Sequence, residues 1–266
     1  MFSKKKGRKG PKFRKKKKPL YKRKGFWIGL ATILFIGFLV WALFFSSWFQ
    51  VKYLEITGTE TIDKNELLNF CKEKIPRKFV FLSSQSIFLV SAKELRESVQ
   101  TKYPQVEKVF IKRKFPKTLT IQVEERRAIA NFSGCQKTFL MDKEGVIFRE
   151  ENNSQLFLVQ KEETKDCFLG KKILNQKEIE ALFLIKDKFY PEEEISLIKF
   201  YPFKVEVLAE RGWKVIFSLE KDLAKQLDNL EVLIDQKIKK ENLSQVEYID
   251  LRFDEIFYKL KEKITE

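Results

Sequence analysis

The most apolar part of the chain runs from Phe26 to Val51 and contains no charged residue, with Phe, Leu, Ile or Trp at most positions. As a helix, residues 26–49 would extend ~36 Å, enough to cross a hydrocarbon core of ~30 Å with some tilt. Trp27 and Trp48 lie near its two ends, where indole rings favour the membrane interface. The pattern therefore predicts one transmembrane helix over residues 26–49.

A cleaved signal peptide is the alternative interpretation of this stretch. Signal peptides have an apolar region of about 7–15 residues, followed by small residues at the cleavage site. Here the apolar run is longer, and it ends in Ser46-Ser47-Trp48-Phe49, with bulky aromatic side chains where cleavage needs small ones. The sequence favours an uncleaved anchor.

Residues 51–125 show patterns that predict the element order β-α-α-β-β. Ser91 with Glu94 is a capping-box signature at the start of the second helix. Near the end of this region Leu119, Ile121 and Val123 alternate with polar residues, as in a strand buried on one face. The predicted elements are a strand at 51–57, a helix from 62 to Pro76, short apolar stretches at 79–82 and 87–89, a helix from 91 to about 103, and strands at 106–114 and 119–125.

Residues 126–260 predict a β-rich domain with flanking helices. Gly145 supplies the positive φ of a hairpin turn, and Asn175 with Glu178 is a second capping-type helix start. The predicted elements are a hairpin at 140–148, a helix at 175–189, a hairpin of strands 205–208 and 213–219, a helix from 223 to at least 234, and strands at 248–253 and 256–260. The predicted fold class is α+β, and residues 261–266 form a short tail.

Charge is concentrated at one end of the chain. Of the formal net charge of +16, residues 1–25 supply fourteen Lys or Arg and no acidic residue, whereas the rest has 39 basic and 37 acidic residues. Basic residues resist translocation, so residues 1–25 are expected to form a cytoplasmic tail, with everything after the span on the other side of the cytoplasmic membrane.

Nucleic-acid binding is the other interpretation of the basic tail. The tail has no aromatic residue interleaved with its basic run beyond Phe13 and Tyr21. Membrane topology and attraction to anionic headgroups explain the charge without a further role. We therefore expect a membrane and no nucleic acid among its partners.

The residue types present argue against catalysis. There is no histidine, no Gly-rich phosphate loop and no G-x-S-x-G motif, so no catalytic, metal or cofactor site assembles, and no small-molecule substrate is expected. Cys71, Cys135 and Cys167 are an odd number without C-x-x-C spacing, which argues against a disulfide framework and a zinc site. Cys71 lies on an apolar helix face and is expected to be a buried thiol. Whether Cys135 and Cys167 pair stays open.

Residues 51–125 resemble a POTRA domain. The matching residues follow the pattern P-x-V-x-x-V…R-x-x-P-x-T-L-x-I-x-V-x-E-R from Pro104 to Arg126, and Ile56-Thr57-Gly58 resembles the entry of such domains. Thr59 departs from the Asn that often follows this Gly, and a turn tolerates the change.

Together with the basic tail, the single span and the later sequence Tyr248-Ile249-Asp250-Leu251-Arg252, the chain resembles the bacterial cell-division family FtsQ/DivIB over roughly residues 20–260. Leu219-Glu220 departs from the usual Leu-Gly. Phe253 stands where Tyr is common, so any hydroxyl contact made there in relatives is not available. The resemblance implies a scaffold at the division septum that binds FtsB/DivIC-like and FtsL-like proteins and thereby regulates the septal peptidoglycan synthase complex.

The resemblance also implies where the partner binds. In the family a partner strand adds to the last strand of the second domain, which corresponds here to residues 256–260. The implied partner-binding residues are Arg252, Phe253, Ile256, Phe257, Tyr258, Lys259 and Leu260. One hypothesis is that Arg252 pairs with a carboxylate of the partner; the alternative is that it pairs with a neighbouring acid such as Asp254.

A POTRA unit next to a membrane is also compatible with a polypeptide-transport or envelope-assembly system. Such systems usually stack several POTRA units before a large barrel. Here one unit is followed by only about 140 residues, too few for a barrel of sixteen strands of ~10 residues each. The sequence favours the division scaffold.

Overall fold

The computed structural model describes residues 24–75, 78–79, 82–83, 85–162, 164–190 and 193–261. Most of the predicted basic tail, the helix stop at Pro76 and nearly all of the predicted C-terminal tail lie outside the described residues. The chain forms two compact units. The first unit comprises the described parts of residues 1–53, 75–90 and 113–119, and the second unit comprises the remainder up to residue 261.

The first unit contains α1, Lys24–Phe45, the one helix among the described residues that is long and apolar enough to cross a membrane, with a mean hydropathy of 2.5. The predicted end at Phe49 was wrong, because the helix stops at Phe45. Ser46 is the cause: its hydroxyl accepts the N–H of Trp48 at 3.3 Å, and its carbonyl accepts that of Phe49 at 3.2 Å, which makes a turn. The 22 residues of α1 extend ~33 Å, close to the ~30 Å of a hydrocarbon core.

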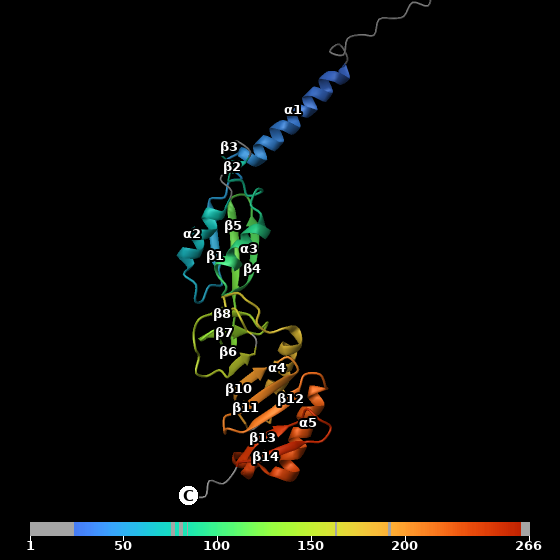
Figure 1. Ribbon diagram of the computed structural model, residues 1–266. Coiled ribbons are helices and arrows are strands. Elements are labelled where there is room, and N and C mark those ends of the chain that lie inside the picture. Colours follow the sequence, from blue (N-terminus) through green and yellow to red (C-terminus); the bar gives the residue numbers. More distant parts are fainter. Residues whose placement is uncertain are drawn as a thin grey trace, which may run out of the picture. The chain divides into compact units, whose positions relative to one another are not determined.

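The rest of the first unit gathers at the Phe45 end of α1 (Figure 1). The short strands β2, Lys78–Phe79, and β3, Leu82–Ser83, form an antiparallel pair. Gln50 forms an isolated antiparallel bridge with Ser86, and the N–H of Val51 donates to the carbonyl of Gln85 at 3.0 Å. The sequence predicted a strand that begins at Val51. This bond holds Val51 to Gln85 instead, and the next strand begins at Tyr53.

The second unit begins with the predicted β-α-α-β-β order. Its elements are β1 (Tyr53–Thr57), α2 (Lys64–Lys74), α3 (Ala92–Lys102), β4 (Val106–Lys114) and β5 (Thr118–Glu125), and the sheet order is β1-β5-β4. Helix α3 starts at Ser91, whose hydroxyl accepts the N–H of Glu94. Cys71 is fully buried, so the prediction of a buried thiol is confirmed. Burial raises the pKa of this thiol to about 11.

The two sheets of the second unit join at Glu125 and Arg126. The Glu125 carboxylate accepts the N–H groups of Glu60 at 2.8 Å and Thr61 at 3.0 Å. Burial alone would raise the pKa of Glu125, but these hydrogen bonds outweigh it and lower the pKa. Arg126 pairs with the buried carboxylate of Asp142 in the following sheet. The carboxylate and the guanidinium are therefore structural groups.

The second sheet has nine strands in the order β14-β13-β12-β11-β10-β9-β6-β7-β8. Most neighbours are antiparallel, and β9 is parallel to both β6 and β10, as β13 is to β12. The strands are β6 (Ala128–Gly134), β7 (Lys137–Asp142), β8 (Ile147–Arg149), β9 (Leu158–Lys161), β10 (Ile195–Phe200), β11 (Lys204–Ala209), β12 (Lys214–Ser218), β13 (Val246–Asp250) and β14 (Phe257–Leu260).

Two crossover connections carry the helices of this domain. Between β9 and β10 lies α4, Gln176–Lys188, which begins with a complete capping box at Asn175. Between β12 and β13 lie α5, Leu223–Leu233, a π-helical turn, Ile234–Ile238, and a 3-10 segment, Lys240–Gln245. The helices contact each other and share one continuous core with the strands, in which the fully buried Trp213 stacks on Phe189 with 5.7 Å between ring centroids.

The sequence predicted the α+β fold class, both hairpins and both long helices of this sheet domain, and these are confirmed. Strands β6, β9 and β10 were not predicted. The strand predicted at 248–253 was wrong at both ends, because it runs from Val246 to Asp250. It stops there because the Asp250 carboxylate accepts the N–H of Arg252 at 3.1 Å and turns the chain.

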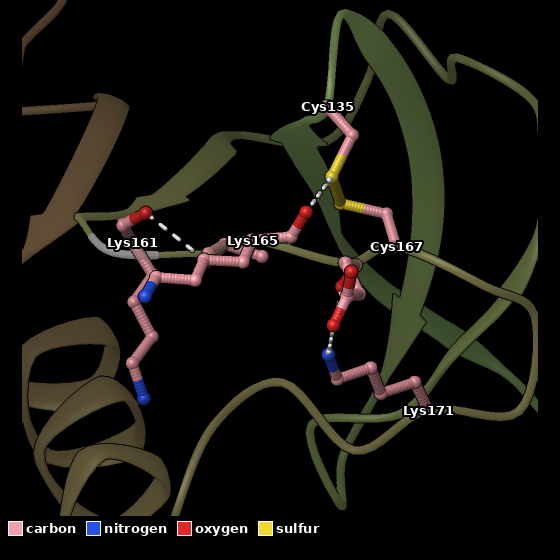
Figure 2. The surroundings of a disulfide bond; sticks show 7 residues. Cys135, Lys161, Lys165, Cys167 and Lys171 are labelled. Carbon is pink, nitrogen blue, oxygen red and sulfur yellow. Dashed lines mark hydrogen bonds and ion pairs between the residues drawn. A yellow bond between two sulfur atoms is a disulfide. The ribbon is translucent and has the colours of Figure 1, made fainter.

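Cys135 and Cys167 form a disulfide with 6.1 Å between their Cα atoms (Figure 2). The sequence argued against a disulfide framework but left the pairing of these two cysteines open, and the structure shows that they pair. Cys71 makes the cysteine count odd, and a separation of 32 residues in sequence carries no signature. Cys135 and Gln136 have φ of 51° and 63°, left-handed values that are uncommon for residues other than Gly and Asn, at the turn between β6 and β7.

Candidate functional site

The nine-stranded sheet has two edge strands, and one of them, β8, is covered. The carbonyl of Ile147 accepts the N–H of Gly170 at 2.7 Å, and its N–H donates to the carbonyl of Lys171 at 3.1 Å. The carbonyl of Gly145 accepts the N–H of Ile173 at 2.8 Å. Residues 170–173 therefore occupy the hydrogen-bonding groups of this edge, and we call them the covering segment. Figure 2 shows Cys167, just before this segment, tied to the β6–β7 turn.

The other edge strand, β14, is exposed. Its four residues are all exposed, with Phe257, Tyr258 and Leu260 at 51%, 46% and 50%. Its only partner strand in the described part of the chain is β13, which pairs with it antiparallel. Exposed apolar side chains on an unpaired edge are the features that proteins usually avoid, because another strand can add there.

One hydrogen bond at the end of the β13–β14 ladder fixes the direction of the β14 backbone groups. The N–H of Lys261 donates to the carbonyl of Gln245 at 2.7 Å and therefore points toward β13. Alternate residues of a strand point their N–H groups to opposite sides. The N–H groups of Lys259 and Phe257 thus point toward β13, and those of Tyr258 and Leu260 point away from the sheet.

Arg252 lies in the loop between β13 and β14 and is paired within the chain. Its Nε and Nη2 donate to the two carboxylate oxygens of Asp250 at 3.0 and 2.7 Å, a bidentate pair. Burial alone would raise the pKa of Asp250, but the bonds from Arg252 outweigh it and lower the pKa. The alternative, in which Arg252 pairs with a neighbouring acid of the chain, is confirmed, but that acid is Asp250; Asp254 pairs with Lys221 at 2.8 Å.

Aromatic side chains surround this loop. The guanidinium carbon of Arg252 lies 5.3 Å from the ring centroid of Phe253, which meets Phe257 edge to face at 6.1 Å. Beside them is an open hollow of ≈ 560 Å³, and Phe203, Lys221 and Phe253 are among the residues that line it. Phe203 was not among the residues predicted for binding. The signal in the sequence is an aromatic residue directly after Pro202, and the structure places it, exposed, in the β10–β11 turn.

A charged cluster lies beside the hollow, on strands β11 and β12. Lys204 pairs with Glu206 at 2.7 Å, and Lys214 lies 3.7 Å from the same carboxylate. Burial would raise the pKa of Glu206, but the bonds from Lys204 and the charge of Lys214 outweigh it and lower the pKa. The Glu206 carboxylate is therefore paired with two lysines of the same chain.

The structure brings together six of the seven residues that the sequence predicted for partner binding. Arg252 and Phe253 lie beside the hollow, and residues 257–260 form β14. Ile256 differs, because its side chain is half-buried and packs against the core of the sheet domain. Its contribution to an exposed surface is therefore small.

Comparisons with known proteins place residues 49–126 in a family model described as a POTRA domain of the FtsQ type. The chain is 24% identical over 214 residues, 77% of each chain, to the cell division protein DivIB of Clostridium tetani. It is 24% identical over 106 residues to DivIB of Clostridium acetobutylicum, covering 40% of this chain and 39% of that one. It is 25% identical over 120 residues to the cell division protein FtsQ of Streptomyces bingchenggensis, covering 45% of this chain and 42% of that one.

Proposed function

Because the chain belongs to the FtsQ/DivIB family of bacterial cell-division proteins, we propose that it is a non-catalytic scaffold of the division machinery. Helix α1 anchors it in the cytoplasmic membrane at the septum. A POTRA domain at 51–125 and a β domain at 126–260 lie outside the cytoplasm. Its partners are FtsB/DivIC-like and FtsL-like proteins, through which it positions the septal peptidoglycan synthase complex.

Two observations support the proposed orientation. Residues 1–25 carry fourteen basic residues and no acidic one, and such a segment resists translocation. The Cys135–Cys167 disulfide belongs to the other side of the membrane, because disulfides persist in oxidising compartments and are rare in the cytosol. A reporter fused after Glu266 should therefore be active outside the cytoplasm, and a cytoplasmic signal would contradict the orientation.

The observation that carries the proposal is the uncovered edge of β14. A partner strand that pairs there gains hydrogen bonds from the outward N–H groups of Tyr258 and Leu260, and it covers the half-exposed side chains of Phe257, Tyr258 and Leu260. The open hollow beside Phe253 can receive a side chain that follows the added strand.

Arg252 has a double role in this proposal. Asp250 holds one side of its guanidinium, which fixes the loop that leads into β14. A guanidinium has five N–H donors, so a bidentate pair leaves others for a partner carboxylate. Arg252→Glu is expected to weaken partner binding at least tenfold; affinity equal to that of the wild type would contradict the role of Arg252.

The sharpest test is a pair of proline variants on β14. Tyr258→Pro removes an N–H that points away from the sheet, and we expect at least a tenfold loss of affinity for the co-purified FtsB/DivIC-like protein of the same organism. Its thermal stability should stay close to that of the wild type, because an edge strand tolerates proline where the N–H faces solvent. Tyr258→Ala controls for the loss of the side chain.

Lys259→Pro is the matched control, because its N–H points toward β13. We expect it to destabilise the β13–β14 pair, with a lower melting temperature and faster hydrogen exchange at residues 246–250. A folded Tyr258→Pro variant that binds its partner like the wild type would refute strand addition at this edge.

The cellular role is tested by depletion of the protein in its native host, with a fluorescent fusion as the reporter. Midcell localisation, with filamentous cells after depletion, is the expected result. A uniform envelope signal with normal division would refute the division role and favour the transport or assembly alternative.

A further inference from the structure

The first unit is purely basic, in contrast to the rest of the chain after Gly25. Residues 26–53, 75–90 and 113–119 contain six Lys or Arg and no Asp or Glu. The remainder of residues 26–266 contains 33 basic and 37 acidic residues. A segregation of this kind produces a local positive potential, and that potential attracts anionic partners.

Aromatic side chains gather in the same unit. Phe88 lies between Phe49 and Phe115, with ring centroids 5.5 and 5.4 Å apart. Trp48 is 71% exposed and Phe115 is 58% exposed. Lys52 and Lys117 lie alongside, joined by the bond from the Lys52 N–H to the Lys117 carbonyl at 2.9 Å. We call Trp48, Phe49, Phe88 and Phe115, with Lys52, Lys114 and Lys117, the aromatic–basic collar.

Hydrogen bonds fix the collar to the end of the membrane helix. The hydroxyl of Ser86 donates to the carbonyl of Leu43 in the last turn of α1 at 3.0 Å, and the N–H of Ile87 donates to the carbonyl of Phe49 at 2.8 Å. Because α1 is only slightly longer than a hydrocarbon core, Phe45 lies at its boundary. The headgroup layers add roughly 5–8 Å on each side, and the collar begins at Trp48, three residues after Phe45.

We infer that the aromatic–basic collar lies in the headgroup layer of the membrane and binds anionic phospholipid there. Aromatic rings prefer this layer, and each Lys near an anionic surface strengthens binding by about fivefold. The inference depends on α1 crossing the membrane and on neither the partner nor the division role.

Tryptophan fluorescence of the full chain in vesicles tests this directly. Trp27, Trp41 and Trp48 are replaced by Phe, and Phe115→Trp introduces the reporter, while the fully buried Trp213 gives a constant background. The vesicles contain phosphatidylcholine and phosphatidylglycerol at about 7:3, with a headgroup-labelled quencher lipid. We expect at least twofold quenching and a blue shift relative to the detergent-solubilised chain.

Phe203→Trp in the same background is the control, because Phe203 is also exposed, at 67% against 58% for Phe115, and is not part of the collar. It should show little quenching by lipid and strong quenching by aqueous acrylamide. Equal responses of the Phe115→Trp and Phe203→Trp chains would overturn the inference. So would a Phe115→Trp chain shielded from both quenchers, since a protein segment would then cover the collar.

The charge requirement is tested separately. Lys114→Glu with Lys117→Glu, or vesicles of phosphatidylcholine alone, should remove most of the lipid quenching. Lys64→Glu with Lys72→Glu, two exposed positions of α2, should leave it unchanged. Quenching that is independent of both lysines and of phosphatidylglycerol would refute anionic-lipid binding. Partner affinity in detergent is measured in parallel, so the failure of one proposal is distinguishable from that of the other.

Discussion

The two edge strands of the nine-stranded sheet are similar in length but differ in whether other residues cover them. β8 has three residues and β14 has four. Ile147 and Phe148 of β8 are buried, and the covering segment occupies its hydrogen-bonding groups. All four residues of β14 are exposed. One edge of the sheet is thus sealed by a disulfide-tethered segment, whereas the other is open to the addition of a strand, as proposed above.

The largest expected effect on this comparison comes from the disulfide. Cys135→Ser with Cys167→Ser opens a loop of about 33 residues and is expected to lower the free energy of unfolding by about 3–4 kcal/mol. Hydrogen exchange at Ile147 should accelerate as the covering segment loosens, whereas β14 should exchange as before. Denaturant titration measures the first effect. A loss of less than about 1 kcal/mol would show that the cover holds without the disulfide.

The next largest loss of stability is expected from a substitution in the turn between β7 and β8. Gly145 has φ +75°, and an added Cβ would lie 2.9 Å from the Cβ of Leu174, just beyond the covering segment. Gly145→Ala is expected to cost about 2–3 kcal/mol. Gly170→Ala is the matched control, with φ +89° but its nearest contact at 3.7 Å, and it should cost about 1 kcal/mol. Equal costs would mean that the contact with Leu174 contributes nothing.

At the open edge, the Asp250–Arg252 pair has a smaller, pH-dependent effect. The folded-state pKa of Asp250 is lowered, so its contribution to stability is present above the unfolded value of ~3.9 and is lost as the pH falls through the folded-state pKa. Asp250→Asn is expected to cost about 1–2 kcal/mol at neutral pH and progressively less below about pH 4. Unfolding curves from pH 3 to 7 measure this, and a difference that stays constant with pH would contradict it.

The smallest effect on stability is expected on β14 itself. Leu260→Ser removes an exposed side chain, so it should change the free energy of unfolding by less than about 0.5 kcal/mol while it weakens partner binding. Ile256→Ala, only four residues earlier, should cost more than 1 kcal/mol, because that side chain packs against the core. Thermal unfolding separates the two, and a reversed order would mean that β14 is part of the folded core.

The sequence predicts those elements whose signal is local. Alternation at Leu119, Ile121 and Val123, the positive φ of Gly145 and the capping box at Asn175 each specify their structure within a few residues. Strand β9 has no such signal. It has four residues, and its burial comes from β6 and β10, whose paired residues lie about 27 and 39 positions away in the chain.

The candidate site likewise has a part that the sequence predicts and a part that it does not. The residues of β14 follow from the family resemblance, because strand addition needs a terminal strand at an edge. The pairing of Arg252 with Asp250 could not be chosen over Asp254 from the sequence, since both acids lie two residues from Arg252 and only the end of β13 decides between them. The hollow could not be predicted from the sequence, because it lies between the β10–β11 turn and the β13–β14 loop, which are about fifty residues apart in the chain.

The strand order has a consequence for biogenesis. From β9 to β14 each new strand joins the sheet beside the one made before it. A polypeptide whose residues after α1 leave the translocation channel in chain order can therefore lengthen this sheet one strand at a time, and β14 is added last. A truncated or half-exported molecule would present a different edge strand.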